Sequence, residues 1–196
     1  MKKIKTALLT FVTTLTLFSF QSTSEASSTH VVKAGESLWK IGNHYGVPVQ
    51  AIKRLNNQSA NMVYAGQSLA IPQSISTAEK DLLARLVSAE AKGESYAGKV
   101  AVATVVLNRV DHPDFPDTVK DVIYQIDGGH YAFTPVQNEE INKAADTASV
   151  KAVNEALAFR GQGNGSLYFY NPNTSTSKWI LSRQPTVKIG NHVFAK

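Results

Sequence analysis

A continuous apolar segment constrains the fold of this chain more than any other feature of its sequence. Residues 100–107 read VAVATVVL, and they lie within a stretch, residues 96–110, that follows Ser95, a favourable residue for a helix N-cap. A helix that is apolar on nearly every side belongs inside a folded core. We therefore expect residues 96–110 to form a central helix around which the rest of its domain packs.

The composition indicates what holds that core together. The chain has no cysteine, which excludes disulfide bonds, cysteine nucleophiles and thiolate metal ligands. The formal net charge is +5, and it is spread along the chain without a block of Lys or Arg. This mild excess suits an anionic polymer such as a cell wall as well as it suits an ordinary solvated surface. Nothing in the pattern indicates nucleic-acid recognition.

The N-terminus has the layout of a secretory signal peptide. Three lysines within the first five residues precede an uncharged, mostly apolar run at residues 6–20, and the following residues are small and polar. Ser24 and Ala26 fit a cleavage site, and the run is shorter than the roughly 18–20 residues that span a bilayer. We predict a signal peptide over residues 1–26, export, and no stable membrane insertion after cleavage. An uncleaved membrane anchor is the alternative. Cleavage lowers the formal net charge from +5 to about +3, since three lysines and one glutamate leave.

The segment after the leader predicts a small module with the order strand, helix, helix, strand. Residues 30–32 are rich in β-formers, and Ser37 can cap the first helix. A second helix follows with Ile52 and Leu55 facing inward, and residues 68–71 supply the closing strand.

The motifs of this module resemble the LysM family. They are Val32-x-x-Gly35-Glu36-Ser37-Leu38-x-x-Ile41, Tyr45-Gly46-Val47, Leu55-Asn56 and Ala65-Gly66-Gln67-Ser68-Leu69-x-Ile71-Pro72. The resemblance covers residues 29–73 and implies a βααβ module that binds glycans containing N-acetylglucosamine in a shallow groove. The groove residues that it implies are Gly35, Glu36, Ser37 and Leu38 on one side and Asn61, Met62 and Val63 on the other. We assign Trp39 to core packing in preference to stacking on a sugar.

Helical patterning resumes after a short linker, residues 72–76, and predicts a second domain over residues 78–196. Ser76 and Glu79 form a plausible capping box for a helix that Gly93 ends. Further helices are expected over residues 96–110, 118–124 and 148–160, and extended structure over residues 187–194. The second domain is therefore expected to be mainly helical with a small β element, and the whole chain to be α+β.

Glu90 is the first candidate for catalysis. It follows Leu83, Leu86 and Val87 at helical spacing, so it shares their apolar face. A carboxyl group in apolar surroundings has a raised pKa and can stay protonated near neutral pH, as a general acid for glycosidic cleavage requires. The alternative is a partly exposed, solvated residue at the end of the helix.

The wider pattern resembles the spore cortex-lytic enzyme family, the SleB/CwlJ type of cell-wall hydrolase. The segments that carry it are AEAKGESYAGKVAVA (89–103), VLNRV (106–110), FPDT (115–118), VIY (122–124), AFTPV (132–136), YFYNP (168–172), KW (178–179) and IGNHVF (189–194). They occur in the family's order and cover essentially all of residues 78–196. The resemblance implies a fold related to goose-type lysozyme and to soluble lytic transglycosylases.

The same resemblance makes Glu90 the catalytic residue. It implies that Glu90 protonates the oxygen between N-acetylmuramic acid and N-acetylglucosamine, and then takes the proton of the muramic C6 hydroxyl, which closes a 1,6-anhydro ring without water. One carboxylate can perform both steps because the internal hydroxyl replaces the nucleophile that a second carboxylate provides in a retaining glycosidase.

The sugar-binding cleft is expected to combine aromatic rings, which stack on sugar faces, with hydroxyl and amide groups. The candidate substrate-binding residues are Glu94, Phe133, Thr134, Tyr168, Tyr170, Asn171 and Trp179. Core packing is the alternative for each aromatic residue. Glu94 could instead cap the helix that begins after Ser95.

Two other functions remain alternatives. An N-acetylmuramoyl-L-alanine amidase or an endopeptidase would cut the stem peptide, usually with zinc or a cysteine. The five histidines form no compact ligand set, so we predict neither a metal nor another cofactor, with a zinc site assembled from distant residues as the alternative. The second is a non-catalytic protein that only binds peptidoglycan, the partner expected in every case. The resemblances imply a secreted protein of the cell wall or spore envelope, and germination, sporulation and vegetative wall turnover all remain open.

Overall fold

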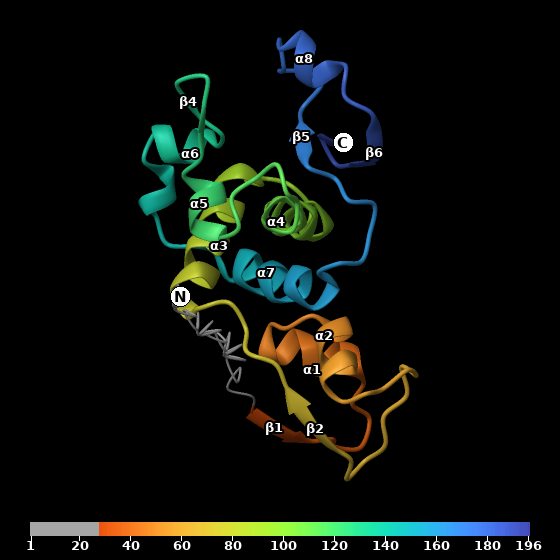
Figure 1. Cartoon of the computed structure of the whole chain (residues 1–196). Coiled ribbons are helices and arrows are strands. Elements are labelled where there is room, and N and C mark those ends of the chain that lie inside the picture. The colour runs from red at the N-terminus through yellow and green to blue at the C-terminus, as the bar shows by residue number, and fades with distance from the viewer. Residues whose placement is uncertain (1–27) are drawn as a thin grey trace, which may run out of the picture.

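The computed structural model describes residues 28–196, which form two connected parts, each with its own hydrophobic core (Figure 1). The first part is a small βααβ module and the second is mainly helical, so the predicted α+β class is confirmed. The predicted signal peptide, residues 1–26, lies outside the described residues. Among residues 28–196, no helix combines the length and the hydrophobicity needed to cross a membrane.

The N-terminal module packs two helices against a two-stranded antiparallel sheet. Its elements are β1 (Ser28–Val31), α1 (Leu38–Tyr45), α2 (Val49–Leu55) and β2 (Ser68–Ile71). Ser37 caps α1 as predicted, because its hydroxyl accepts a hydrogen bond from the backbone N–H of Lys40 at 3.3 Å. Gly46 ends α1 in the left-handed conformation, with φ of 63°.

The core of this module confirms one of the two positions predicted to face inward on α2. Ile52 is fully buried, but Leu55 is 46 % exposed, so its prediction was wrong. The reason is the residue that follows. The side chain of Asn56 donates hydrogen bonds to the carbonyls of Ile52 and Ala70 and accepts one from Ala70 N–H, so this amide ties the end of α2 to β2.

The second part is built around α4 (Tyr96–Val110), as its apolar sequence predicted. Three other helices pack against it, namely α3 (Thr77–Glu90), α5 (Val119–Ile123) and α7 (Thr147–Phe159). Figure 1 looks nearly along α4, with α7 beside it and the C-terminal sheet on its other side. Ser95 caps α4, and Ser76 with Glu79 forms the predicted capping box at the start of α3. Val102, Val105 and Val106 are fully buried.

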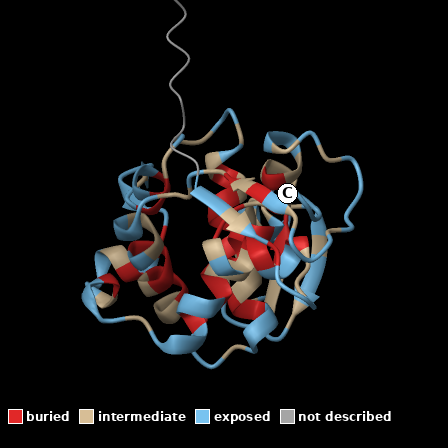
Figure 2. Ribbon diagram, turned by 90° about the horizontal axis from the view of Figure 1, so that it is seen from below, coloured by how far each residue is buried: buried red, intermediate tan, exposed pale blue. Residues whose placement is uncertain are grey.

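Several short elements complete this part. They are β3 (Ile126–Asp127), β4 (His130–Tyr131), α6 (Thr134–Gln137), the 3-10 turn η1 (Glu140–Asn142), β5 (Tyr168–Tyr170), α8 (Lys178–Leu181), β6 (Pro185–Ile189) and β7 (His192–Ala195). The last three strands form an antiparallel sheet in the order β5-β7-β6. The extended structure predicted over residues 187–194 is thus a hairpin that turns at Gly190. Buried residues lie on the inner faces of the helices and exposed ones outside (Figure 2).

The two parts meet where α1 packs against α7. Trp39 on α1 is 40 % exposed and its ring lies 6.4 Å from that of Phe159 on α7, so the assignment of Trp39 to core packing was wrong. Two hydrogen bonds reinforce the junction: Lys80 Nζ donates to the carbonyl of Tyr45, and the hydroxyl of Ser74 donates to the carbonyl of Gly46. These contacts hold the small module against the helical part.

Candidate functional site

Glu90 is the last residue of α3, on the helix face that the sequence predicted to be apolar. Leu83, Leu86 and Val87 on this face are completely buried, and Glu90 itself is partly buried at the end of the same stripe. The capping box at the other end of α3 fixes where the helix begins and thereby the face on which Glu90 lies.

This environment makes Glu90 a weak acid. Burial raises the pKa of its carboxyl group to about 7, although the positive charge of Arg109 acts in the opposite direction. Within the described chain, no hydrogen bond contributes to this pKa. The protonated and ionised forms are therefore both well populated near neutral pH, which lets one group donate a proton and later accept one.

Arg109 comes from the central helix α4 and is only 7 % exposed. Its Nε donates a hydrogen bond to the carbonyl of Leu167 at 2.8 Å. Its guanidinium carbon lies 5.2, 5.0 and 5.5 Å from the ring centroids of Phe115, Phe133 and Tyr168, respectively. Burial lowers the pKa of Arg109 to about 10, so the side chain remains a cation at neutral pH. The helix thus places one fixed positive charge near Glu90.

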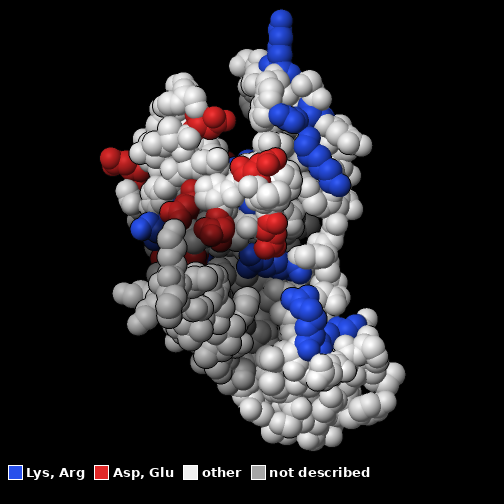
Figure 3. Space-filling model, viewed as in Figure 1, with Lys and Arg blue, Asp and Glu red and all other residues white. Residues whose placement is uncertain are grey.

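Arg109 forms part of the floor of a cleft of about 470 Å³. The cleft lies between the β3–β4 hairpin and the segment that carries β5 and α8, and Figure 3 shows the hollow between these two lobes. Its other lining residues are Asp114, Phe115, Gln125, Asp127, Ala132, Tyr168, Phe169, Trp179 and Ile180. The lining combines aromatic rings with polar groups, which is the combination that sugar rings require.

One wall of the cleft carries a stack of aromatic and cationic groups. Trp179 is 53 % exposed, and its ring meets that of Tyr168 edge-on at 5.2 Å. The guanidinium of Arg183 lies 4.0 Å from the centroid of Trp179 and 4.9 Å from that of Tyr168. Because its partners fix the indole while half of its surface stays open, Trp179 presents a flat apolar face to the solvent.

The structure separates the predicted substrate-binding residues into two groups. Tyr168 and Trp179 line the cleft, whereas Thr134, Tyr170 and Asn171 are not among its lining residues. Phe133 is 3 % exposed and belongs to the core, where it stacks on Phe169 and underlies Arg109. Core packing, the alternative given for each aromatic residue, therefore applies to Phe133, which supports the cleft from beneath.

Glu94 is neither the cap of α4 nor a lining residue of this cleft. The cap is Ser95, while the carboxylate of Glu94 accepts hydrogen bonds from the backbone N–H and the side-chain amide of Asn191, at 3.2 and 3.0 Å. A side chain at Gly190 would collide with this carboxylate, since an added Cβ would lie 2.1 Å from Glu94 Oε2. Glu94 therefore fastens the β6–β7 turn to the start of α4.

The predicted groove of the N-terminal module consists of residues with different exposures. Leu38 is 2 % exposed, so its side chain lies in the module's core and only its backbone could meet a ligand. Glu36 accepts hydrogen bonds from Lys33 N–H and His30, which lower its pKa. Met62 is 64 % exposed.

The remaining groove residues fit a surface role to different degrees. Gly35 is exposed and its carbonyl accepts a hydrogen bond from Lys40 Nζ, and Ser37 is engaged as the cap of α1. Asn61 is exposed and accepts a hydrogen bond from Lys53, while Val63 packs partly against the module's core.

Arg109 is the main site residue that the sequence prediction did not single out, although it stood within one of the family segments. A signal was present: it follows Val102, Val105 and Val106 at helical spacing, so a charged group lies on the most apolar face of the chain. A cation on such a face requires partners inside the fold. Phe115, Gln125 and Ile180 carried no comparable signal, because only the tertiary fold brings their segments together.

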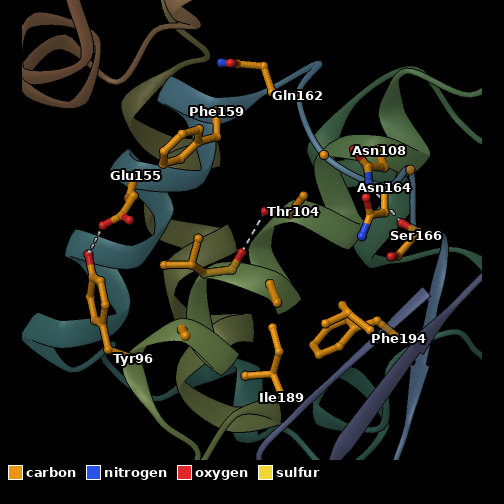
Figure 4. Close-up of a pocket in the computed structure, with 16 residues that line it drawn as sticks. Tyr96, Thr104, Asn108, Glu155, Phe159, Gln162, Asn164, Ser166, Ile189 and Phe194 are labelled. Atoms are coloured by element: carbon orange, nitrogen blue, oxygen red, sulfur yellow. Dashed lines mark hydrogen bonds between the residues drawn. The ribbon is translucent and has the colours of Figure 1, made fainter. Parts of the chain in front are cut away.

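A second cavity, of about 540 Å³, lies between α4, α7 and the C-terminal sheet (Figure 4). Its walls are mainly apolar, with Phe159, Ile189 and Phe194 among them, and Tyr96 donates a hydrogen bond to Glu155 at 2.8 Å along one edge. Neither Glu90 nor Arg109 lines it. Arg109 lines the first cleft, whereas Glu90 is not among the lining residues of either cavity and is linked to the first cleft through the charge of Arg109. The cleft above Arg109 is therefore the one that combines a buried charge with aromatic and polar lining residues.

Comparison with known proteins gives two family matches, Cell Wall Hydrolase over residues 93–195 and LysM domain over residues 30–72. The spore cortex-lytic enzyme of Halalkalibacterium halodurans is 41 % identical over 63 % of this chain and 36 % of its own length. That of Bacillus cereus is 40 % identical over 64 % of this chain and 47 % of its own length. This chain thus spans less than half of either relative.

The structural comparison agrees with the family matches. The solved catalytic domain of the germination-specific lytic transglycosylase SleB from Bacillus anthracis aligns with a TM-score of 0.57 and 40 % identity. The alignment covers 64 % of this chain and 100 % of that domain. The resemblances drawn from the sequence are therefore confirmed for both parts of the chain.

Proposed function

This chain belongs to the cell wall hydrolase family and carries a LysM module, and on that premise we propose that it degrades peptidoglycan as a lytic transglycosylase. It cleaves the glycosidic bond between N-acetylmuramic acid and N-acetylglucosamine and leaves 1,6-anhydro-muramic ends. Glu90 is the catalytic residue, and the cleft above Arg109 receives the glycan strand.

The observation that carries this proposal is the pKa of Glu90. Burial raises it to about 7, so a large fraction of the carboxyl groups still holds a proton near neutral pH. Cleavage needs an acid at the leaving oxygen and then a base for the ring hydroxyl. A carboxyl group with a pKa near the working pH serves in both steps.

The reaction balances without water. The C1–O bond of the muramic residue breaks, and the departing oxygen takes the proton of Glu90. The muramic C6 oxygen then bonds to C1, and its hydroxyl proton returns to Glu90, so the enzyme leaves the cycle in the form in which it entered. A second carboxylate nucleophile has no task, since the internal hydroxyl replaces it.

Arg109 supports the middle of this cycle. Once the proton has left, Glu90 is an anion in apolar surroundings, and the cation of Arg109 is the charge that offsets it. Trp179 and Tyr168 offer stacking faces in the cleft for the sugar rings on either side of the scissile bond.

The LysM module acts as the second point of attachment to the wall. Its contact with α7 keeps it beside the catalytic part, so binding of one strand raises the local concentration of substrate at the cleft. The lysine-rich, apolar N-terminal sequence supports export to the cell wall or spore envelope.

The product of the reaction tests the proposal. Purified vegetative wall and spore cortex are digested with the full chain, and the fragments are identified by mass spectrometry. Anhydro-muramic ends are expected, and they should be absent with Glu90→Gln. Reducing muramic ends would indicate a hydrolytic muramidase instead of a transglycosylase, and freed stem peptides would indicate an amidase. Intact walls would leave only a binding function.

A further inference from the structure

A separate basic pocket of about 280 Å³ opens beside the end of α3. It shares no residue with the cleft, yet it begins one residue from Glu90, because Ala89 and Gly93 belong to its wall. Six charged side chains line it, the basic Arg85, Lys92, Lys99 and Lys143 and the acidic Glu140 and Asp146.

The acidic members of this basic pocket are already engaged by the protein. Asp146 caps α7, accepting a hydrogen bond from Ser149 N–H at 2.7 Å, and also accepts bonds from Lys99 Nζ at 2.9 Å and the Ser88 hydroxyl at 3.1 Å. The hydrogen bonds from Lys99 and Ser149 hold the pKa of Asp146 well below its usual range. Glu140 pairs with Lys143. Neither carboxylate therefore needs a ligand.

The basic side chains of this pocket outnumber its acidic ones. Among the lining groups, four cations face two anions. Asp81 lies outside the wall and pairs with Arg85 at 3.0 Å, which still leaves one cation in excess. Lys92 forms no ion pair within the described part of the chain and is exposed at the mouth of the pocket. The N-terminus of α7, which Asp146 caps, adds positive partial charge.

We propose that the basic pocket binds a carboxylate of the peptide attached to muramic acid. The inference rests on the proposed function, which puts a muramic residue at Glu90. Where a stem peptide is attached, the lactyl carboxyl of muramic acid is amidated, so the anion nearest to the scissile bond belongs to the peptide stem. Two extended residues reach about 7 Å, so a stem carried by a muramic residue at Glu90 extends towards the pocket, whose wall includes the adjacent Ala89. This contact fixes the direction of the strand and favours muramic residues that carry a peptide.

Direct binding is the first test. The full chain with Glu90→Gln, which keeps any substrate intact, is labelled with ¹⁵N and titrated with synthetic L-Ala-γ-D-Glu-diaminopimelate and with the same tripeptide after amidation of every carboxylate. Amide shifts are expected at Lys92, Gly93 and Ala144 with the first peptide only. Lys92→Gln should weaken binding about fivefold, whereas Lys188→Gln, which removes an exposed charge on β6, should leave it unchanged.

Equal binding of the amidated peptide, or no shift at these residues, would overturn the proposal. So would shifts at the same residues with glycerol phosphate but not with the tripeptide, because the pocket would then read phosphate of wall-attached polymers. Cleavage supplies the second readout: with stem-bearing glycan, Lys92→Glu should raise KM about tenfold and Lys188→Gln should not. The titration does not depend on cleavage, so it stays informative if Glu90 proves not to be catalytic.

Discussion

Glu90 and Glu94 lie four residues apart at the junction of α3 and α4, and the fold gives them opposite properties. Burial raises the pKa of Glu90 to about 7 and no hydrogen bond counters it within the described chain. Burial also acts to raise the pKa of Glu94, but hydrogen bonds from Asn191 outweigh it and lower the pKa overall. One carboxyl group is therefore kept ready to exchange a proton, and the other is held as a structural anion.

The difference comes from residues remote in sequence. Asn191 is 97 positions from Glu94 and reaches it only because the β6–β7 turn closes over the start of α4. Glu90 instead ends a helix whose buried face faces the core, with Arg109 as its charged neighbour. Two similar side chains in one short segment thus take different roles because different parts of the fold surround them.

The largest expected effect separates the two carboxylates by activity. Glu90→Gln keeps the size of the side chain but removes the exchangeable proton, so kcat on purified peptidoglycan should fall by about 10³-fold or more. Glu94→Gln keeps an acceptor for Asn191 and should retain activity within about tenfold of wild type. Release of soluble muropeptides measures both. Equal losses in the two variants would show that the distinction between a proton donor and a structural anion is mistaken.

The pH dependence is the next largest effect. Glu90 must be protonated to act as the acid, so kcat/KM should decline as the pH rises through about 7. Arg109→Gln removes the charge that lowers the pKa of Glu90, and should move this decline to higher pH while reducing the rate about tenfold.

Arg109→Lys is the matched control, because it retains a cation without the planar contacts to the aromatic rings. The pH at which kcat/KM of Arg109→Lys declines should stay near that of wild type. Glu94→Gln should also leave the decline in place, since the pKa of Glu94 is lowered and its charge does not change in this range. If Glu94→Gln moved the decline in kcat/KM as far as is expected for Arg109→Gln, the titrating carboxylate would be Glu94 and not Glu90.

Stability should distinguish the carboxylates in the opposite sense. The folded pKa of Glu90 exceeds the ordinary value of 4.5, so the folded state binds more protons than the unfolded state between these two values. The contribution of Glu90 to the free energy of unfolding should therefore be greatest below about pH 4.5 and be lost, by at most about 3 kcal/mol, as the pH rises through about 7.

Glu90→Gln abolishes this pH-dependent loss. The variant should be more stable than wild type at pH 8 and gain little at pH 4.5, as urea denaturation at the two values would measure. Glu94→Gln should instead lower stability at pH 8, because its ionised form is the one that the fold favours. If the stability that Glu90→Gln gains over wild type is no larger at pH 8 than at pH 4.5, Glu90 is not the buried acid described here.

Local signals explain what the sequence could predict. Ser37, Ser76 and Ser95 cap helices through hydrogen bonds that span only three residues, and the apolar face of α3 follows from a simple period. The helices and the burial beside Glu90 were predictable for this reason. Leu55 and Trp39 were assigned wrongly because their surroundings depend on Asn56 packing onto β2 and on the contact with α7.

Apart from the burial of Arg109, which helical spacing could have indicated, the parts of the site that escaped prediction depend on contacts between distant segments. The β3–β4 hairpin and α8, which form the walls of the cleft, are two and four residues per element and carry too few positions for a period to be recognised. The hydrogen bond from Arg109 to Leu167 joins residues 58 positions apart. Glu94 carried a charge pattern compatible with capping, and the structure decides against it because Ser95 is the cap and Asn191 engages the Glu94 carboxylate.

The smallest expected effect tests how closely the two carboxylates are coupled. Asn191→Ala removes the side-chain donor to Glu94 but keeps the backbone N–H, so the pKa of Glu94 should move back towards its ordinary value and Tm should fall by about 2 °C. The pKa of Glu90, followed by carboxyl ¹³C shifts, and the pH at which cleavage declines should not change. A parallel shift at Glu90 would mean that the turn at Asn191 also shapes the catalytic end of α3, and the two carboxylates would then have to be treated as one coupled pair.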